Sequence, residues 1–196
     1  MPNDFDSAHQ VRHYSSEGWR TQSIAPQRVV LMGVCGCGKS SLGLVLADEL
    51  GWTFVEGDSE HGENNVAKME SGLPLNDEDR ADWLDRLSLR LAQAHEDGRG
   101  LIMSCSALKR SYRDRLRLGD ADVLFVHLQG DEDLITKRMS ARRDHYMPIS
   151  LIQSQFADLQ PPGTDELAMS LSIDHSIEQL AQAVLEQLRT KERVHD

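Results

Sequence analysis

Eight consecutive residues decide the fold of this chain: Gly33-Val34-Cys35-Gly36-Cys37-Gly38-Lys39-Ser40. They fit the pattern G-x-x-x-x-G-K-[ST]. Residues 28–32, just before them, form a short apolar run rich in strand-forming residues. Residues 42–50, just after them, repeat leucine and valine at helical spacing, and Gly51 is a helix-stop signal. A strand, a glycine-rich turn and a helix in this order predict a phosphate-binding loop (P-loop).

The residue types of the loop explain the chemistry. Glycines accept backbone angles that a Cβ disfavours, so the loop can turn its amide groups inward around phosphate oxygens. The N-terminus of the following helix adds donors and a positive dipole end. Lys39 is expected to reach the β- and γ-phosphates, and the Ser40 hydroxyl to bind Mg²⁺. We expect ATP to contact Gly33, Val34, Cys35, Gly36, Cys37, Gly38, Lys39, Ser40 and Ser41. The alternative is a glycine-rich turn that binds nothing.

The composition is that of one ordinary globular domain. The chain has 196 residues, 39% of them hydrophobic and 27% charged, which suffices for one well-packed core. The net charge of −11 argues against nucleic acid or an anionic membrane as the main partner. No apolar run approaches the roughly 18 residues of a membrane span, and no signal-peptide pattern is seen. Three cysteines, without a second pair of metal ligands, suit a reducing cytoplasm.

The alternation of apolar runs and helical patterns predicts an α/β fold. Strands are expected at 28–32, 53–55, 101–103, 123–128 and, half exposed at an edge, 169–173. Helices are expected at 40–50, from Asn76 to the glycines at 98 and 100, at 107–118, from Glu132 into the basic residues near 143, at about 150–159, and after the capping box Ser176-x-x-Gln179. Residues 60–75 read as a mixed polar stretch, and 1–27 as a flexible N-terminal extension. We predict one domain, 28–196, with a parallel five-stranded sheet between helical layers, a helical substrate-binding insert at about 60–97 and a short lid at about 138–149.

Two absences narrow the class of nucleotide-binding protein. The guanine-reading pattern N-K-x-D of GTPases is not found. The third strand ends in Ser104, whereas many ATPases place a magnesium-binding aspartate there. Both favour a compact kinase, in which Mg²⁺ is held by the P-loop hydroxyl, phosphates and water.

Several blocks of the sequence resemble gluconokinases of the thermoresistant type, a family of P-loop small-molecule kinases. They are the P-loop, Gly57-Asp58 with His61, residues 65–80 with Trp83-Leu84, Cys105–Lys109 with Tyr112-Arg113, and later Arg138, Arg142, His145 and Ser154-Gln155-Phe156. The resemblance covers about 28–190. It implies an adenylate-kinase-like fold, ATP- and Mg²⁺-dependent phosphorylation of D-gluconate to 6-phosphogluconate, and a homodimer. The chain departs from the family with cysteines at 35 and 37, where serine is common, and with Gln160, where glutamate is usual.

The roles of single residues can also be argued from their chemistry. Phosphoryl transfer to an alcohol depends on positioning and charge neutralisation. Asp58, at the end of a strand, is our candidate for the carboxylate that holds the acceptor hydroxyl and takes its proton; alternatively it caps the next segment or binds Mg²⁺ through water. A sugar acid also requires cations, for which Arg80, Lys109 and Arg113 are available. Alternatively, these three side chains are solvated on the protein surface and bind no substrate.

The remaining candidates are weaker. Lys68 is either a substrate contact or a lysine on a helix surface. Arg138 and Arg142 share a helix face, so that Arg138 can cover adenine and Arg142 can meet the transferred phosphate; alternatively both complement the helix dipole. His61 and His145 are further substrate-binding candidates. Trp83 is assigned to the core.

Other functions stay open at this point. The chain can be a kinase for another small hydroxy acid such as shikimate, a nucleoside monophosphate kinase, or a nucleotide-binding regulatory protein without chemistry. The P-loop cysteines raise a separate hypothesis. Cys35 and Cys37 lie near Lys39 and a helix N-terminus, which favours reactive thiolates; alternatively they are two unreactive small side chains.

Overall fold

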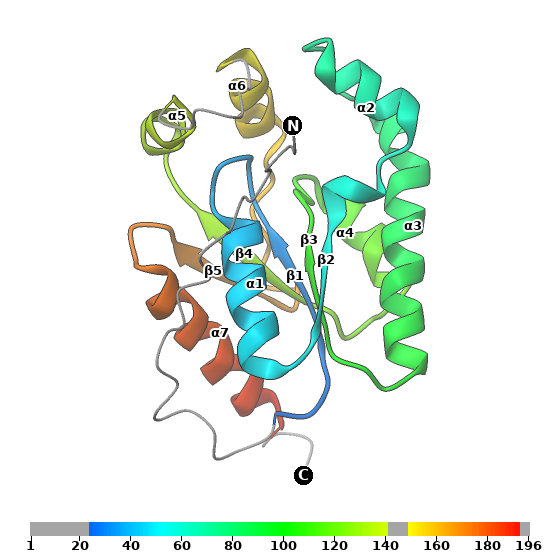
Figure 1. Ribbon diagram of the computed structural model, residues 1–196, viewed down its shortest axis with the longest axis vertical. Coiled ribbons are helices and arrows are strands. Elements are labelled where there is room, and N and C mark those ends of the chain that lie inside the picture. Colours follow the sequence, from blue (N-terminus) through cyan, green and yellow to red (C-terminus); the bar gives the residue numbers. More distant parts are fainter. Residues whose placement is uncertain (1–23, 141–148, 193–196) are drawn as a thin grey trace, which may run out of the picture.

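The computed structural model describes residues 24–140 and 149–192, and its core is a parallel five-stranded sheet (Figure 1). The strands are β1 Arg28–Met32, β2 Thr53–Glu56, β3 Leu101–Ser104, β4 Leu124–Gln129 and β5 Ala168–Ser172. Their order in the sheet is β2-β3-β1-β4-β5, so β1 is central and its neighbours on the two sides are β3 and β4. Five strands were predicted at these places, and β5 lies at an edge as expected.

Helices cover both faces of the sheet, and the alternation of β1 explains the two layers. Val29 and Leu31 belong to a core shared with the buried faces of α1 (Lys39–Leu50) and α7 (Ile177–Glu192). Val30 and Met32 point to the opposite core, which is built with α3 (Asp77–Glu96) and α4 (Arg110–Arg117). The successive side chains of a strand face opposite sides, so the apolar residues 29–32 of β1 contribute to both cores.

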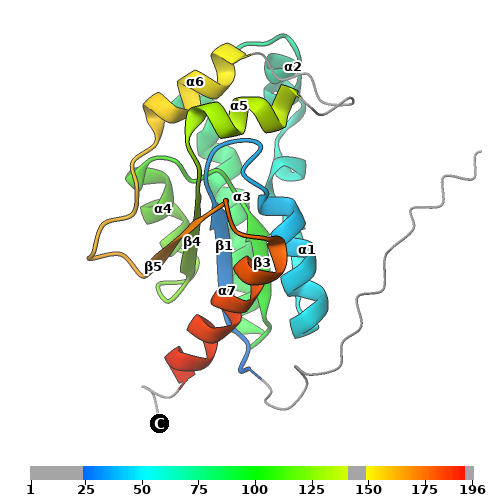
Figure 2. The ribbon, with the colours of Figure 1, turned by 90° about the vertical axis from the view of Figure 1, so that its left-hand side faces the viewer.

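Three further helices lie beyond the carboxyl ends of the strands in both ribbon views (Figures 1 and 2). They are α2 (Glu63–Glu70), α5 (Glu132–Ser140) and α6 (Ile149–Asp158). The P-loop after β1, a 3₁₀ turn (Gly57–Glu60) after β2, and the segment after β3 start at this same end of the sheet. In open α/β sheets ligands bind at this end, beside the strand where the order reverses, which here is β1.

The helix boundaries differ from expectation in two places. Residues 60–75 were expected to be merely mixed and polar, yet they contain α2, which buries none of its side chains. The basic helix expected at 107–118 begins only at Arg110, because Ala107 has a positive φ of 43° and Lys109 is extended. The predicted capping box of Ser176 and Gln179 forms. A second capping box, between Asn76 and Asp79, begins α3 at the expected helix start.

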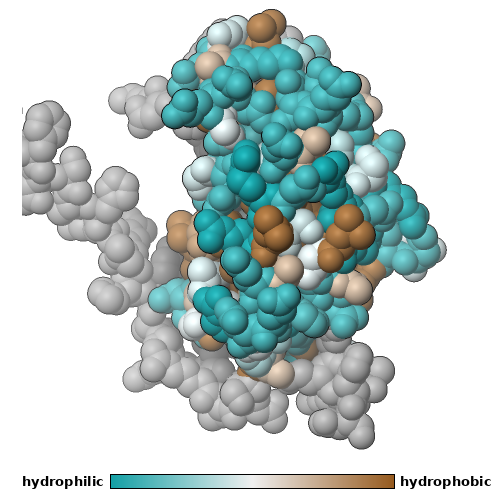
Figure 3. All heavy atoms as spheres, turned by 90° about the vertical axis from the view of Figure 1, so that its right-hand side faces the viewer, coloured by the Kyte–Doolittle hydropathy of each residue, from teal (hydrophilic) through white to brown (hydrophobic). Residues whose placement is uncertain are grey.

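The surface offers no broad apolar face among the described residues. The large exposed hydrophobic side chains are scattered over several elements: Leu44, Val66, Met69, Leu73, Leu89, Leu118 and Leu167. On the face in Figure 3 the hydrophobic spheres form separate spots in a hydrophilic surround. Within 24–140 and 149–192 no helix is long and apolar enough to cross a membrane. The homodimer, the cytoplasmic location and the limits of extension, insert and lid stay predictions; residues 1–23 and 141–148 lie outside the described part.

Candidate active site

The P-loop has the backbone that its glycines predict. Gly33, Gly36 and Gly38 have φ angles of 131°, 83° and 98°, which residues with a Cβ rarely adopt. Two of these glycines are also confined by their neighbours. A Cβ on Gly33 would lie 2.7 Å from the carbonyl oxygen of Leu128, and one on Gly36 would lie 2.6 Å from the Met139 sulfur. The loop is therefore packed between β4 and α5 in a shape that only glycine allows.

The Lys39 side chain folds back over the loop. Its Nζ donates hydrogen bonds to the carbonyl oxygens of Gly33 and Val34, both at 3.0 Å, and lies 4.0 Å from the sulfur of Cys37. Burial acts to lower the pKa of Lys39, but the acidic groups of Cys37 and Asp58 outweigh it, so the pKa is raised. Lys39 is thus held as an ammonium ion in the concave part of the loop.

One P-loop amide already has an oxygen acceptor from another element. The Cys35 amide donates to Oε1 of Gln155 in α6 at 2.6 Å. The side-chain oxygen of Gln155 therefore accepts the same hydrogen bond that a phosphate oxygen accepts when it is bound in a P-loop. In the sequence, Gln155 was noted only because the run Ser154-Gln155-Phe156 resembles gluconokinases. A glutamine by itself does not indicate a contact with the P-loop.

Ser40 and Ser41 are exposed in the first turn of α1, at the open side of the loop. In the described part of the chain no three His, Cys, Asp or Glu side chains are arranged to hold a metal ion by themselves. A divalent cation at the Ser40 hydroxyl would therefore take most of its ligands from phosphates and water, as the lack of an aspartate at Ser104 suggested.

Asp58 lies on the 3₁₀ turn after β2, and its side chain is exposed. Across residues 24–140 and 149–192 its carboxylate makes no hydrogen bond or ion pair, although its charge raises the pKa of Lys39. It therefore lies near the Lys39 ammonium with its oxygens available. Neither a capping contact nor any other protein partner accounts for it.

His61 stacks on the buried indole of Trp83, with ring centroids 4.2 Å apart and planes 15° from parallel. Burial lowers the pKa of His61, with Asp58 opposing this effect and Arg80 adding to it. His61 is therefore a neutral ring at neutral pH, close to both charged groups. Trp83 is in the core as predicted, at 1% exposure.

Arg80 and Lys109 flank the ring of Tyr112, each about 5.6 Å from its centroid. Arg80 donates to the Tyr112 hydroxyl at 3.2 Å, and Lys109 donates to Asp77 at 2.7 Å. Tyr112 donates to the same Asp77 carboxylate, so the hydrogen bonds from Lys109 and then Tyr112 lower the pKa of Asp77. Arg80 has no carboxylate partner anywhere in the described ranges. Two of the predicted cations thus gather here. Arg80 makes no direct ion pair in the described part of the chain, although its charge helps to lower the pKa of Asp77 and of Asp79.

Lys68 makes an ion pair with Asp79 at 2.5 Å, and both side chains are partly exposed. The same Asp79 closes the capping box of α3 with Asn76. This contact matches the alternative of a lysine on a helix surface, and a substrate role for Lys68 stays a prediction.

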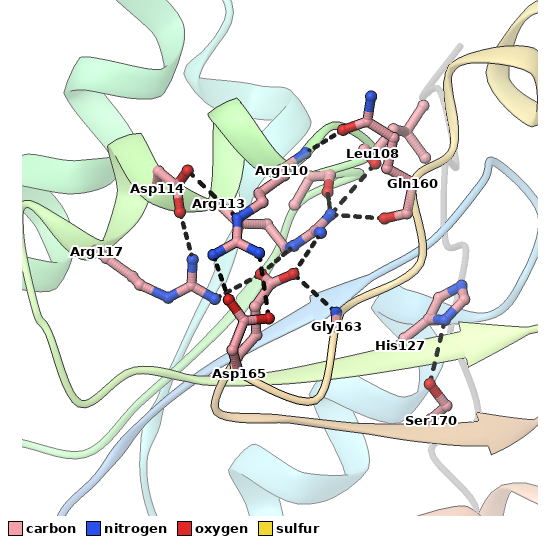
Figure 4. Close-up of polar contacts among 12 residues, drawn as sticks. Leu108, Arg110, Arg113, Asp114, Arg117, His127, Gln160, Gly163, Asp165 and Ser170 are labelled. Carbon is pink, nitrogen blue, oxygen red and sulfur yellow. Dashed lines mark hydrogen bonds and ion pairs between the residues drawn. The ribbon is translucent and has the colours of Figure 1, made fainter.

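The expectation that Arg113 binds substrate is wrong. Its side chain is 1% exposed and makes two hydrogen bonds to Glu166, at 2.7 and 2.8 Å. Its remaining contacts are the carbonyl oxygens of Ala107, Leu108 and Gln160. Figure 4 shows Arg113 enclosed between α4 and the loop with Gln160 and Gly163. A guanidinium committed in this way anchors that loop and has no donor turned to a ligand.

Arg138, at the exposed end of α5, donates to the carbonyl oxygen of Ile173 at 2.8 Å, which links α5 to the loop after β5. Its contact with adenine stays a prediction. The predictions for Arg142 and His145 concern residues 141–148, which lie outside the described residues.

The parallel sheet with its P-loop after the central strand, and the cations Arg80 and Lys109 at the same end of the sheet, define a P-loop kinase of small molecules. A family model described as an AAA domain matches residues 29–162. A probable gluconokinase of Rattus norvegicus is 41% identical over 84% of this chain and 98% of its own. A gluconokinase of Gluconobacter oxydans is 44% identical, covering 76% of this chain and 84% of its own. The crystal structure of a gluconokinase from Sinorhizobium meliloti superposes with a TM-score of 0.79 at 38% identity, covering 87% of this chain and 96% of that one. The chain belongs to the gluconokinase family, as its resemblance implied.

Proposed function

We propose that this protein transfers the γ-phosphoryl group of ATP to the terminal hydroxyl of D-gluconate, giving 6-phosphogluconate and ADP. The observation that carries the proposal is Arg80, a partly buried guanidinium without a carboxylate partner in the described chain, at the same end of the sheet as the P-loop. Membership of the gluconokinase family supports the choice of acceptor.

The nucleotide side is the P-loop. Its inward amides receive the phosphate oxygens, and Lys39 moves from the carbonyls of Gly33 and Val34 to the β- and γ-phosphates. Gln155 releases the Cys35 amide to a phosphate oxygen. The Ser40 hydroxyl would hold Mg²⁺, which would supply positive charge to stabilise the transferred phosphoryl group. We assign Arg138 to the adenine and Arg142 to the transferred phosphoryl group.

The acceptor side is the group formed by Asp58, His61, Arg80 and Lys109. Asp58 holds the terminal hydroxyl and accepts its proton as the oxygen attacks the γ-phosphorus. The Arg80 guanidinium binds the gluconate carboxylate with its forked donors, and Lys109 adds a second positive charge. The neutral His61 ring can hydrogen-bond a hydroxyl on the carbon chain of gluconate. Lys68 and His145 are further candidates for binding the substrate.

The test is ADP release measured with ATP, Mg²⁺ and a panel of gluconate, glucose, shikimate and nucleoside monophosphates. We expect gluconate to raise ADP release far above the ATP-only rate and the other acceptors not to do so. Release with shikimate or a nucleotide instead would reassign the acceptor. Tight ATP binding without turnover on any acceptor would favour a regulatory protein that has lost its chemistry.

A further inference from the structure

Helix α3 holds the 3₁₀ turn that carries Asp58. The indole Nε1 of Trp83 donates to the carbonyl oxygen of Gly57 at 2.7 Å, directly before Asp58. Nε of Arg86 donates to the carbonyl oxygen of Glu60 at 2.9 Å, and Arg90 pairs with the Glu60 carboxylate at 3.1 Å. The turn is therefore tied to three successive turns of one helix.

Strand β3 fixes the same turn from the other side. The Gly57 amide donates to the Ser104 hydroxyl at 3.1 Å, so both backbone polar groups of Gly57 are bonded. A Cβ on Gly57 would lie 2.0 Å from the carbonyl oxygen of Ser104. The backbone next to Asp58 is thus clamped between Trp83 and Ser104, with no space to shift.

The helix that holds this clamp also carries Arg80, whose guanidinium makes no ion pair within residues 24–140 and 149–192. Arg80 and Trp83 are three residues apart, so they lie on the same side of α3 with an axial separation of about 4.5 Å. Trp83 is 1% exposed and His61 stacks on it, so its ring has one position. Arg80 and Asp58 both act on the charge state of His61, which places both groups near that ring.

We propose that Trp83 is a positioning residue that fixes, through Gly57, the distance between the Asp58 carboxylate and the Arg80 guanidinium, and so selects the acceptor by its chain length. This inference rests on the proposed function. An aldonic acid bound by its carboxylate at Arg80 presents its terminal hydroxyl to Asp58 only if the carbon chain spans that distance. A misplacement of about 1 Å in such a site costs on the order of 10²-fold in rate. On this proposal, a chain one carbon shorter reaches only one of the two groups.

The test compares Trp83→Phe with Trp52→Phe on two acceptors, gluconate and a five-carbon aldonic acid. Trp83→Phe keeps a buried aromatic ring but removes the donor to Gly57. Trp52 precedes β2 at the opposite end of the strand, so Trp52→Phe makes the same chemical change away from the site. We expect Trp83→Phe to lower kcat/KM for gluconate about 10- to 100-fold, mainly through kcat. The ratio of kcat/KM for gluconate to kcat/KM for the five-carbon acid should fall, while the KM for ATP stays constant. Trp52→Phe should change neither.

Ser104→Ala removes the clamp from the other side and should narrow the same preference, which keeps the proposal testable if Trp83→Phe folds poorly. Equal losses on both acceptors together with a lower Tm would show a purely structural role and overturn the proposal. Unchanged rate and preference in both variants would overturn it as well. If the wild type releases no ADP with gluconate, the proposed function itself is wrong, and this inference falls with it. That outcome is distinct from an active wild type with unselective variants.

Discussion

The guanidinium of Arg113 and the carboxylate of Glu166 form a doubly hydrogen-bonded ion pair in which each side chain is 1% exposed. Arg117 and the Gly163 amide also donate to Glu166, so the carboxylate is fully satisfied. The pair joins α4 to the loop before β5, far apart in the sequence. Breaking a buried ion pair leaves an uncompensated charge inside the protein, so we expect the loss of either partner to destabilise the fold strongly.

We expect Glu166→Gln to lower the free energy of unfolding by about 3–5 kcal/mol, since the Arg113 charge then stays buried without its partner. The matched control is Asp165→Asn at the neighbouring residue, whose exposed carboxylate pairs with the exposed Arg110. That control should change stability little, because exposed pairs are screened by solvent. Urea unfolding of both variants measures the difference. Equal losses would mean that burial of the Glu166 pair adds nothing.

The same pair predicts a dependence of stability on pH. Hydrogen bonds from Arg113 first, and also from Arg117, hold the pKa of Glu166 far below its usual range, against the opposing effect of burial. A lowered pKa in the folded state gives stability that is fully present above the unfolded pKa of about 4.3 and is lost as the pH falls through the folded value. The stability gap between wild type and Glu166→Gln should therefore be constant near neutral pH and narrow in acid. Unfolding curves from pH 7 downward test this, and a gap that widens in acid would contradict the assignment.

Lys39→Ala should leave the fold intact and remove most of the turnover. Among residues 24–140 and 149–192, the Lys39 ammonium bonds the carbonyls of Gly33 and Val34 and approaches the Cys37 sulfur, so its removal should cost little of the packing. Loss of one preorganised charge contact at a developing anion costs about 2.7–4 kcal/mol of transition-state stabilisation. Values of kcat/KM and Tm should be measured on the same preparation. A folded variant with near-normal turnover would rule out the P-loop assignment.

Arg80→Ala should raise the KM for gluconate and leave the KM for ATP unchanged, because in the described part of the chain the Arg80 side chain bonds Tyr112 and makes no contact with the P-loop. Arg115→Ala is a suitable control, since Arg115 also contacts α3, through Asp85, but on an exposed surface. Steady-state kinetics with each substrate varied in turn separate the two KM values. A loss of ATP affinity in Arg80→Ala would place this arginine on the nucleotide side.

The sequence predicts the sheet and the phosphate loop well because both have local signals. Buried parallel strands are short apolar runs, and the glycines at 33, 36 and 38 serve a backbone that other residues rarely adopt. Helix α2 was missed because none of its side chains is buried, so it has no apolar stripe to detect.

The error at Arg113 has a different cause. Its partner Glu166 lies 53 residues away, and in a single sequence a buried, paired arginine looks the same as one available to a ligand. Tyr112 and Asp77 were missed as parts of the site for the same reason, since their contact spans 35 residues. The clamp on Gly57 also depends on tertiary contacts, so Trp83 could be assigned only to the core.

The three cysteines differ in how far a reagent can reach them, which turns the hypothesis of P-loop reactivity into a specific prediction. Cys35 is half-buried in the loop, whereas Cys37 and Cys105 are buried. Burial raises the pKa of the Cys105 thiol to about 12, so it stays protonated and inert. All three lie close enough to Lys39 to influence its charge. We therefore expect peroxide or a thiol-alkylating reagent to inactivate the enzyme through Cys35, by modifying the loop that must receive the phosphates.

The experiment treats wild type, Cys35→Ser, Cys37→Ser and Cys105→Ser with peroxide, with and without MgATP, and then assays turnover before and after reductant. Wild type, Cys37→Ser and Cys105→Ser should lose activity, and MgATP should protect them, because bound phosphates cover the loop. Cys35→Ser should keep its activity, since a hydroxyl is not oxidised under these conditions. Recovery with reductant would identify a reversible oxidation state of the sulfur, such as a sulfenic acid or a disulfide. If Cys35→Ser is inactivated as fast as the wild type, or if MgATP gives no protection, the P-loop cysteines are the two unreactive side chains of the alternative interpretation.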